Sequence, residues 1–291
     1  MDWVLDVTTE HAALTTTGGR VWDAARRLCS YLEETGEALG LLRPGVSVLE
    51  LGSGLGWLGM SLARNLPDVG LVVMTEQEEG GGVDWLRHNL RLNTRLASSG
   101  KLQVVPCDWL HYGQLGAQAG ELGDNPLGAP GAGELQEEPA SRVPQPAPCQ
   151  GAGSTDRAAV SPAHSPGAAG AAGECSGGSG QPECSASWLA QQQWDFIIGS
   201  DLVYNTVGAV CLPRVMRALA RPNTRILYCH TKHRFDTYDI QFFEELAACG
   251  LACSEVHEPS KATPPPSPPP LTDLFPEMRI AVYSIQPSSH C

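Results

Sequence analysis

Residues 46–59 read VSVLELGSGLGWLG, and this stretch decides the fold. Four of the first six residues are apolar, and they predict a short buried strand. A turn with glycine at positions 52, 54 and 56 follows, and the apolar spacing over 58–65 then predicts a helix. A glycine turn between a strand and a helix allows the backbone to approach a ligand closely.

Strands and helices alternate on both sides of this turn. The predicted strands cover 46–51, 70–75, 102–106, 194–200, 225–231, 251–257 and 278–285. The predicted helices cover 21–31, 58–65, 83–93, 207–219 and 235–249. This order predicts an α/β fold with a Rossmann-like, doubly wound, seven-stranded sheet. The last two strands follow each other without a helix, so we expect a mostly parallel sheet with an antiparallel last strand.

A change of composition interrupts this pattern. Residues 113–187 contain 15 Gly and 9 Pro but no Phe, Trp, Tyr or Ile, so they cannot bury enough apolar surface to offset their ordering entropy. We therefore predict a disordered Gly/Pro/Ala-rich insertion at 113–187. Residues 1–112 and 188–291 are then the two parts of one domain of 216 residues.

Charge and cysteine usage exclude several classes of protein. The chain has a net charge of −13, and −7 remains without residues 113–187, so binding of nucleic acid through a large basic surface is disfavoured. No run of about 20 apolar residues is present, so we expect no membrane span. The ten cysteines form no CxxC motif, and we expect no metal site. The first residues, MDWVLDVTTEH, do not resemble a signal peptide, so we expect reduced thiols in a cytoplasmic protein, with the nucleus as a second compartment.

The glycine turn and Glu76 together predict an adenosine cofactor, because a carboxylate after the second strand can accept both ribose hydroxyls. A dinucleotide is one alternative, since Gly54-x-Gly56-x-x-Gly59 matches its fingerprint and Tyr228-x-x-x-Lys232 matches a pair of short-chain dehydrogenases. Two observations disfavour it. The position directly after the strand is already occupied by Gly52, and Tyr228 lies on an apolar β-pattern rather than on a helix.

The pattern Glu50-x-Gly-x-Gly-x-Gly56 instead resembles the S-adenosylmethionine loop of the seven-β-strand methyltransferases. Three further stretches extend the resemblance: TGGRVWDAARRLCSYL at 17–32, Cys107-Asp108-Trp109, and Asp201-Leu-Val-Tyr204. Together they resemble lysine methyltransferase family 16, the methyltransferase-like protein-lysine methyltransferases. The similarity covers roughly 15–110 and 190–286.

The resemblance implies S-adenosylmethionine as the cofactor and assigns a role to each matching residue. Trp22 would pack against the cofactor, Glu76 would bind the ribose, and Gln77 would lie beside the adenine. Asp108 and Trp109 would close the adenine pocket. The methionine end would meet Gly52, Ser53, Gly54 and Gly56, with Glu50 at the strand tip, and Ser200 would also bind the cofactor. Asp201, near the methionine moiety, and Tyr204, near the transferred methyl group, are the two predicted catalytic residues.

The same resemblance implies transfer to lysine side chains of a protein substrate, and relatives act on chaperones, ATPases and translation factors. The strand end lacks the prolines of the Asp/Asn-Pro-Pro-Tyr motif that adenine-modifying enzymes carry, which also disfavours a nucleic-acid substrate. We expect a monomer. A methyltransferase with a different or small-molecule acceptor and a non-catalytic adaptor with this fold remain as alternatives. We interpret the stretch HTKHR at 230–234 as a solvated basic loop at the ligand-binding edge.

Overall fold

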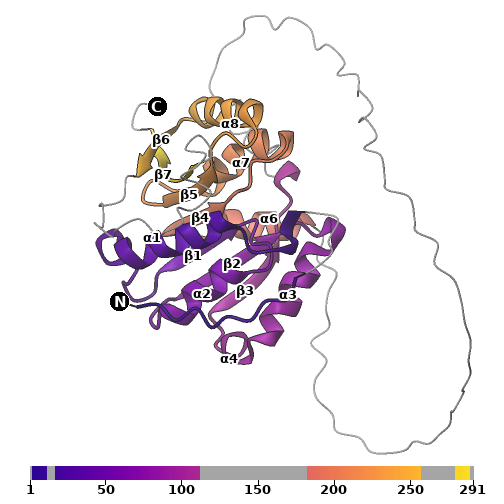
Figure 1. The fold of residues 1–291 in the computed structure, drawn as a ribbon, viewed down its shortest axis with the longest axis vertical. Coiled ribbons are helices and arrows are strands. Elements are labelled where there is room, and N and C mark those ends of the chain that lie inside the picture. The colour runs from indigo at the N-terminus through magenta and orange to yellow at the C-terminus, as the bar shows by residue number, and fades with distance from the viewer. Residues whose placement is uncertain (1, 12–16, 112–181, 257–278, 289–291) are drawn as a thin grey trace, which may run out of the picture. The chain divides into compact units, whose positions relative to one another are not determined.

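The computed structural model describes residues 2–11, 17–111, 182–256 and 279–288. Within these ranges, seven strands form one sheet in the order β3-β2-β1-β4-β5-β7-β6 (Figure 1). The strands are β1 (Ser47–Leu51), β2 (Leu71–Glu76), β3 (Leu102–Pro106), β4 (Phe196–Ser200), β5 (Arg225–Thr231), β6 (Leu251–Val256) and β7 (Ile280–Pro287). All pairs are parallel except those of β7 with β5 and β6. This confirms the predicted α/β fold with an antiparallel last strand.

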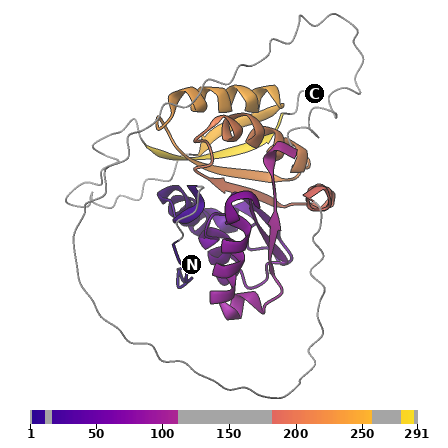
Figure 2. The same cartoon turned by 90° about the vertical axis from the view of Figure 1, so that its right-hand side faces the viewer.

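Helices cover both faces of the sheet. The first face carries α1 (Asp23–Leu39), α2 (Trp57–Asn65) and α3 (Gly82–Leu92), and the second carries α6 (Pro182–Gln191), α7 (Thr206–Leu219) and α8 (Asp236–Ala248). Short elements η1 (Thr17–Gly19), η2 (Glu79–Gly81) and α4 (Thr94–Ala97) complete the described helices. In Figure 2 the orange α7 and α8 lie apart from the indigo-to-magenta N-terminal helices. Strand residues alternate between the two apolar clusters: Val48 belongs to the first and Leu49 to the second.

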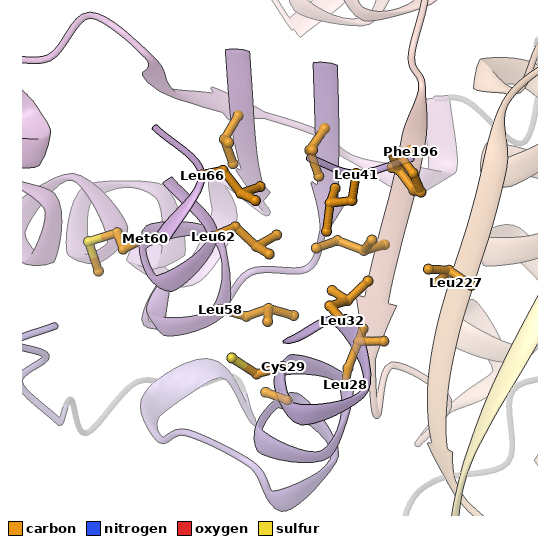
Figure 3. Packing of buried hydrophobic residues seen from close by; sticks show 14 of the residues in the cluster. Leu28, Cys29, Leu32, Leu41, Leu58, Met60, Leu62, Leu66, Phe196 and Leu227 are labelled. Carbon is orange, nitrogen blue, oxygen red and sulfur yellow. The ribbon is translucent and has the colours of Figure 1, made fainter. Parts of the chain in front are cut away.

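The first face has a densely packed core. Leu28 and Leu32 of α1 and Leu58 of α2 lie close together above the sheet, on the side of Phe196 and Leu227 (Figure 3). All five side chains are at most 1% exposed. Burial of each such side chain stabilises the fold by about 1.5–3 kcal/mol. This packing holds α2 against the sheet next to the glycine turn that leads from β1 into α2.

Pairing of β1 with β4 joins the two halves of the sequence. Val48 lies opposite Phe196, and Leu51 lies opposite Gly199. The carboxylate of Asp195 accepts hydrogen bonds from the backbone N–H of Ser47 at 2.9 Å and from Nη2 of Arg43 at 3.1 Å. The two flanks of the predicted insertion therefore form one sheet. Helix α6 begins at position 182, inside the stretch assigned to the insertion, while 113–181 lies outside the described residues.

Helix α1 extends beyond its predicted range of 21–31 and ends at Leu39. The next residue, Gly40, caps the helix in the left-handed conformation, with φ of +78°. Gly36 does not stop the helix. A Cβ at this position would lie 3.4 Å from Cδ2 of Leu41, so the small residue lets the following chain pack back against the helix.

Residues 2–11 form a strap that is held along the first helical face by asparagine side chains. Asn65 binds both the backbone N–H and the carbonyl of Val4, at 2.7 and 2.9 Å. Asn93 binds the same two groups of Thr8 at 2.9 and 2.8 Å, and Asn89 accepts a third backbone N–H from the strap. These bonds satisfy backbone groups of a segment that pairs with no strand.

Candidate active site

A cavity of about 250 Å³ opens at the carboxyl ends of the central strands. This edge is where doubly wound sheets bind ligands, because the loops that follow β1, β2, β3 and β4 meet there. All predicted site residues except Gly56 line the cavity: Trp22, Glu50, Gly52, Ser53, Gly54, Glu76, Gln77, Asp108, Trp109, Ser200, Asp201 and Tyr204. The fold thus brings together residues that are up to 182 positions apart in the chain. Their individual roles toward the cofactor stay predictions.

The glycine turn forms one wall of the cavity with bare backbone. Gly52 and Gly54 have φ of +59° and +54°, a conformation that favours glycine. A Cβ on Gly52 would lie 2.5 Å from Cδ2 of Leu202, and one on Gly54 would lie 3.1 Å from the carbonyl oxygen of Gly18. The backbone N–H of Ser53 donates to the carbonyl oxygen of Thr75 at 2.7 Å and fixes the turn to β2. Because positions 52 and 54 carry no side chain, a ligand can lie directly on the backbone there.

Gly56 is not part of the cavity lining. It has φ of +79° and precedes the first turn of α2, and a Cβ on it would lie 2.4 Å from Cδ1 of Leu86 in α3. The third glycine of the turn therefore serves the packing of α2 against α3. Its predicted contact with the methionine end stays a prediction.

Glu50, at the end of β1, is 3% exposed, and its Oε2 accepts the backbone N–H of Gly59 at 3.1 Å. Burial raises the pKa of this carboxyl to about 8, although hydrogen bonds from Ser53 and Gly59 oppose the shift. Glu50 is then mostly protonated at neutral pH, and it fastens the turn to α2 beneath the cavity.

Two further carboxylates lie at the ends of the next strands. Glu76 ends β2 and is half-buried; its Oε2 accepts the backbone N–H of Gln77 at 2.6 Å, and burial raises the pKa of Glu76. Asp108 follows β3, and its Oδ1 accepts the backbone N–H of Leu110 at 2.9 Å. Trp109 lies beside them, with Cζ2 3.4 Å from the position of a Cβ on Gly52. Carboxylates at neighbouring strand ends beside an indole ring fit the hydroxyls, amine and flat base of an adenosine.

The carboxylate of Asp201 is engaged by the end of β5. Its Oδ1 accepts the backbone N–H of Thr231 at 2.8 Å, and its Oδ2 accepts the hydroxyl of Thr231 at 2.9 Å and Nη1 of Arg234 at 3.2 Å. The side chain is 5% exposed, and the residue has φ of +52°. Three donors fix the orientation of this carboxylate at the wall of the cavity, and its predicted place near the methionine moiety stays a prediction.

The indole ring of Trp22 is close to two arginines that the sequence did not identify as site residues. Cζ of Arg20 is 3.7 Å from the ring centroid of Trp22, and Cζ of Arg234 is 5.1 Å from it. Arg20 also lines the cavity. It stands inside the quoted stretch 17–32, but only the folded chain places it beside the glycine turn. Asn205 and Val207, which line the cavity after Tyr204, were missed because they follow the end of the matching motif.

The cluster at 230–234 comprises the last two residues of β5 and the turn that follows, and it is only partly solvated. His230 is buried, and its Nε2 lies 2.9 Å from Oδ1 of Asp239, while Oδ2 of Asp239 accepts the backbone N–H of His233 at 2.9 Å. This corrects the interpretation as a solvated loop: His230 lies on a strand that is buried on both faces. The described residues contain no group of three or more His, Cys, Asp or Glu placed to hold a metal ion.

The pair that suggested a dehydrogenase is not assembled. Tyr228 is fully buried in β5, and its hydroxyl accepts the backbone N–H of Leu202 at 3.0 Å. The ammonium of Lys232 pairs with the carboxylate of Glu255. Both side chains are thus used inside the domain. In the described part of the chain, no helix is long and apolar enough to cross a membrane.

Comparisons with known proteins give a family. A family model described as lysine methyltransferase matches residues 4–118 and 182–248. An O-methyltransferase from Bacillus cereus, in complex with SAH, is 13% identical with a TM-score of 0.43, over 93% of this chain and 84% of that one. Fibrillarin from Aeropyrum pernix, with natively bound S-adenosyl-L-methionine, is 12% identical with a TM-score of 0.44, over 90% and 76%. A sequence comparison with curated proteins gave no significant match. The family match spans both flanks of 119–181, and the chain belongs to the lysine methyltransferase family, as an S-adenosylmethionine-dependent methyltransferase.

Proposed function

We propose that this enzyme methylates lysine side chains of a protein substrate. The observation that carries the proposal is the match of both flanks to a family model described as lysine methyltransferase. When bound, the cofactor supplies an activated methyl group on a sulfonium. The protein then has to hold the acceptor in line and in a suitable field.

The rim of the cavity supports an amine acceptor on a long apolar stem. Leu110 and Val207 line the cavity and are 51% and 37% exposed. The half-buried Tyr204 also lines the cavity and lies in sequence between the end of β4 and Val207. A lysine side chain has four methylene groups that pack on such a surface. The hydroxyl and ring face of Tyr204 are suited to hold the amine at the end of the stem.

The acceptor amine must lose its proton before transfer, because a lysine has a pKa of about 10.4 and only the neutral amine has a lone pair. The cavity has no evident carboxylate for this task at its acceptor end: Asp201 already accepts three hydrogen bonds. We propose that removal of the ammonium from water at the apolar rim favours the neutral form, and that the proton leaves to solvent.

The test is to incubate the full chain with methyl-labelled S-adenosylmethionine and cell extract, and to identify the labelled amino acid by mass spectrometry. We expect methylated lysine in one or a few proteins. Glu76→Ala should abolish the labelling, whereas Glu79→Ala, an exposed glutamate three residues on, should retain it. Label on an oxygen, a small molecule or a nucleic acid would overturn the lysine assignment. Cofactor binding without any labelling would favour the adaptor.

A further inference from the structure

We infer that Arg20 binds the α-carboxylate of S-adenosylmethionine. The inference rests on the proposed function only in requiring this cofactor in the cavity, and it is independent of which acceptor is methylated. It concerns a residue of the stretch 17–32 to which the resemblance assigned no role, and its grounds are the charges of the cavity, the place of Arg20 and its contacts.

The charged side chains of the cavity are acidic apart from one. The described residues that line it include Glu76, Asp108 and Asp201, besides the mostly protonated Glu50, and Arg20 is the one basic residue among them. S-adenosylmethionine carries two positive groups, the sulfonium and the ammonium, and one negative group, the carboxylate. Carboxylates of the protein attract the first two, but they repel the third unless a cation lies between them.

Arg20 is located at the end of the cavity where the methionine moiety is expected. The carbonyl oxygen of Gly18 lies 3.1 Å from the position of a Cβ on Gly54, so the segment that carries Arg20 packs on the glycine turn. Gly18, Arg20 and Trp22 all line the cavity together with that turn. The ribose and adenine ends, marked by Glu76 and Asp108, belong to strands β2 and β3 on the other side.

The guanidinium of Arg20 is held in place but retains its donors. Its Cζ lies 3.7 Å from the centroid of the Trp22 ring, and a contact with the face of an indole uses none of the five N–H donors of a guanidinium. Arg234, in contrast, donates to the carboxylate of Asp201 at 3.2 Å. The ion pairs within the described ranges include none for Arg20. A planar fork of donors matches a carboxylate with two parallel hydrogen bonds.

An acidic residue of the protein substrate is a second source of a carboxylate for the same guanidinium. A ligand that lacks only the carboxylate of the cofactor distinguishes these two possibilities. Decarboxylated S-adenosylmethionine retains the adenosine, the sulfonium and the amine, and differs from the cofactor in the carboxylate alone.

The experiment is calorimetric titration of the full chain, as wild type and as the variants Arg20→Ala, Arg20→Lys and Arg26→Ala, with each of the two ligands. Arg26 is the matched control, because its guanidinium also lies over an indole, 5.0 Å from the ring centroid of Trp57, but the residue does not line the cavity. We expect Arg20→Ala to weaken binding of S-adenosylmethionine by roughly ten- to a hundred-fold and to leave the decarboxylated ligand unchanged. Arg20→Lys should lose less, and Arg26→Ala should change neither affinity.

Three results would overturn the inference. Equal weakening of both ligands by Arg20→Ala would assign a structural role to Arg20. Unchanged binding of both, with a raised KM for the protein substrate, would assign the guanidinium to a carboxylate of that substrate. Failure of the wild-type protein to bind either ligand would show that this cavity does not bind the cofactor. Transfer to a non-lysine acceptor, in contrast, would refute the proposed function and leave the role of Arg20 intact.

Discussion

At Gly52 the backbone has φ of +59°, and a Cβ would lie 2.5 Å from Cδ2 of Leu202. We expect Gly52→Ala to abolish measurable cofactor binding, because the added methyl group and the shift it forces alter the wall of the cavity. The matched control is Gly100→Ala. Gly100 has φ of +71° with nothing within 4 Å of its Cβ position, so this variant should lose roughly 1 kcal/mol of stability and bind the cofactor like wild type.

The measurement is calorimetric titration with S-adenosylmethionine, with thermal unfolding of both variants to compare their stability. Equal cofactor affinity of Gly52→Ala and Gly100→Ala would show that the turn at Gly52 does not contact the ligand.

Glu50 makes the stability of the domain depend on pH. Burial raises the pKa of Glu50 from 4.5 to about 8, so the unfolded chain releases a proton between these values that the folded chain keeps. Its contribution to stability is complete below pH 4.5 and is lost as the pH rises toward 8. We expect Glu50→Gln to have the same free energy of unfolding as wild type near pH 5. At pH 8.5 we expect the free energy of unfolding of the variant to be higher than that of wild type by a difference on the order of 3 kcal/mol.

Denaturant unfolding of both proteins at the two pH values measures this difference. A difference between the two proteins that does not change with pH would mean that Glu50 is ionised in the folded chain.

The sequence allowed us to predict the site residues that lie at the ends of apolar strands. Glu50, Glu76 and Asp108 each stand at or directly after an apolar strand, and all three line the cavity. The contacts of Asp201 were not predictable, because its partners Thr231 and Arg234 lie 30 and 33 residues away. Pairing across that distance depends on the order of the strands, which one sequence does not reveal.

At the scale of elements, the strap of residues 2–11 depends on asparagine side chains of the first helical face. Asn93 binds Thr8 with both ends of its amide and also donates to the carbonyl oxygen of Asn89 at 2.8 Å. We expect Asn93→Ala to lower the free energy of unfolding by roughly 1–3 kcal/mol, and to expose the strap to proteases. Asn223→Ala, in an exposed loop, is the control.

Limited proteolysis followed by mass spectrometry locates the cleavage, and denaturant unfolding measures the stability. If the strap of Asn93→Ala were cleaved no faster than that of the control, the amide would not hold it.

Elements with a strong apolar pattern were predicted closely, and elements shaped by neighbours were not. Strands β3 and β5 have the predicted bounds of 102–106 and 225–231. Helix α6 was missed because its first half has the composition of the Gly/Pro-rich stretch before it. The sequence also did not predict that β7 lies between β5 and β6. The orders β5-β7-β6 and β5-β6-β7 are both compatible with the same pattern of apolar residues.

At the scale of the whole molecule, both flanks of the sequence build one sheet and one cavity. The β1–β4 pairing and the bonds of Asp195 to Ser47 and Arg43 join them. We therefore expect that replacing residues 113–181 by a Gly/Ser linker of about 20 residues leaves cooperative unfolding and cofactor binding unchanged. Calorimetric unfolding and titration check this. Two separate transitions, or loss of binding, would mean that the replaced residues take part in the fold or the site.

The central claim is that the cavity at the ends of β1–β4 binds S-adenosylmethionine, with Glu76 on the ribose. Calorimetric titration of the full chain tests it most directly, with Glu76→Ala beside the exposed control Glu79→Ala. We predict one cofactor bound per chain, a loss of roughly ten-fold or more in affinity for Glu76→Ala, and none for Glu79→Ala. A folded wild type that binds no cofactor, or a Glu76→Ala variant that binds it with unchanged affinity, would contradict the account.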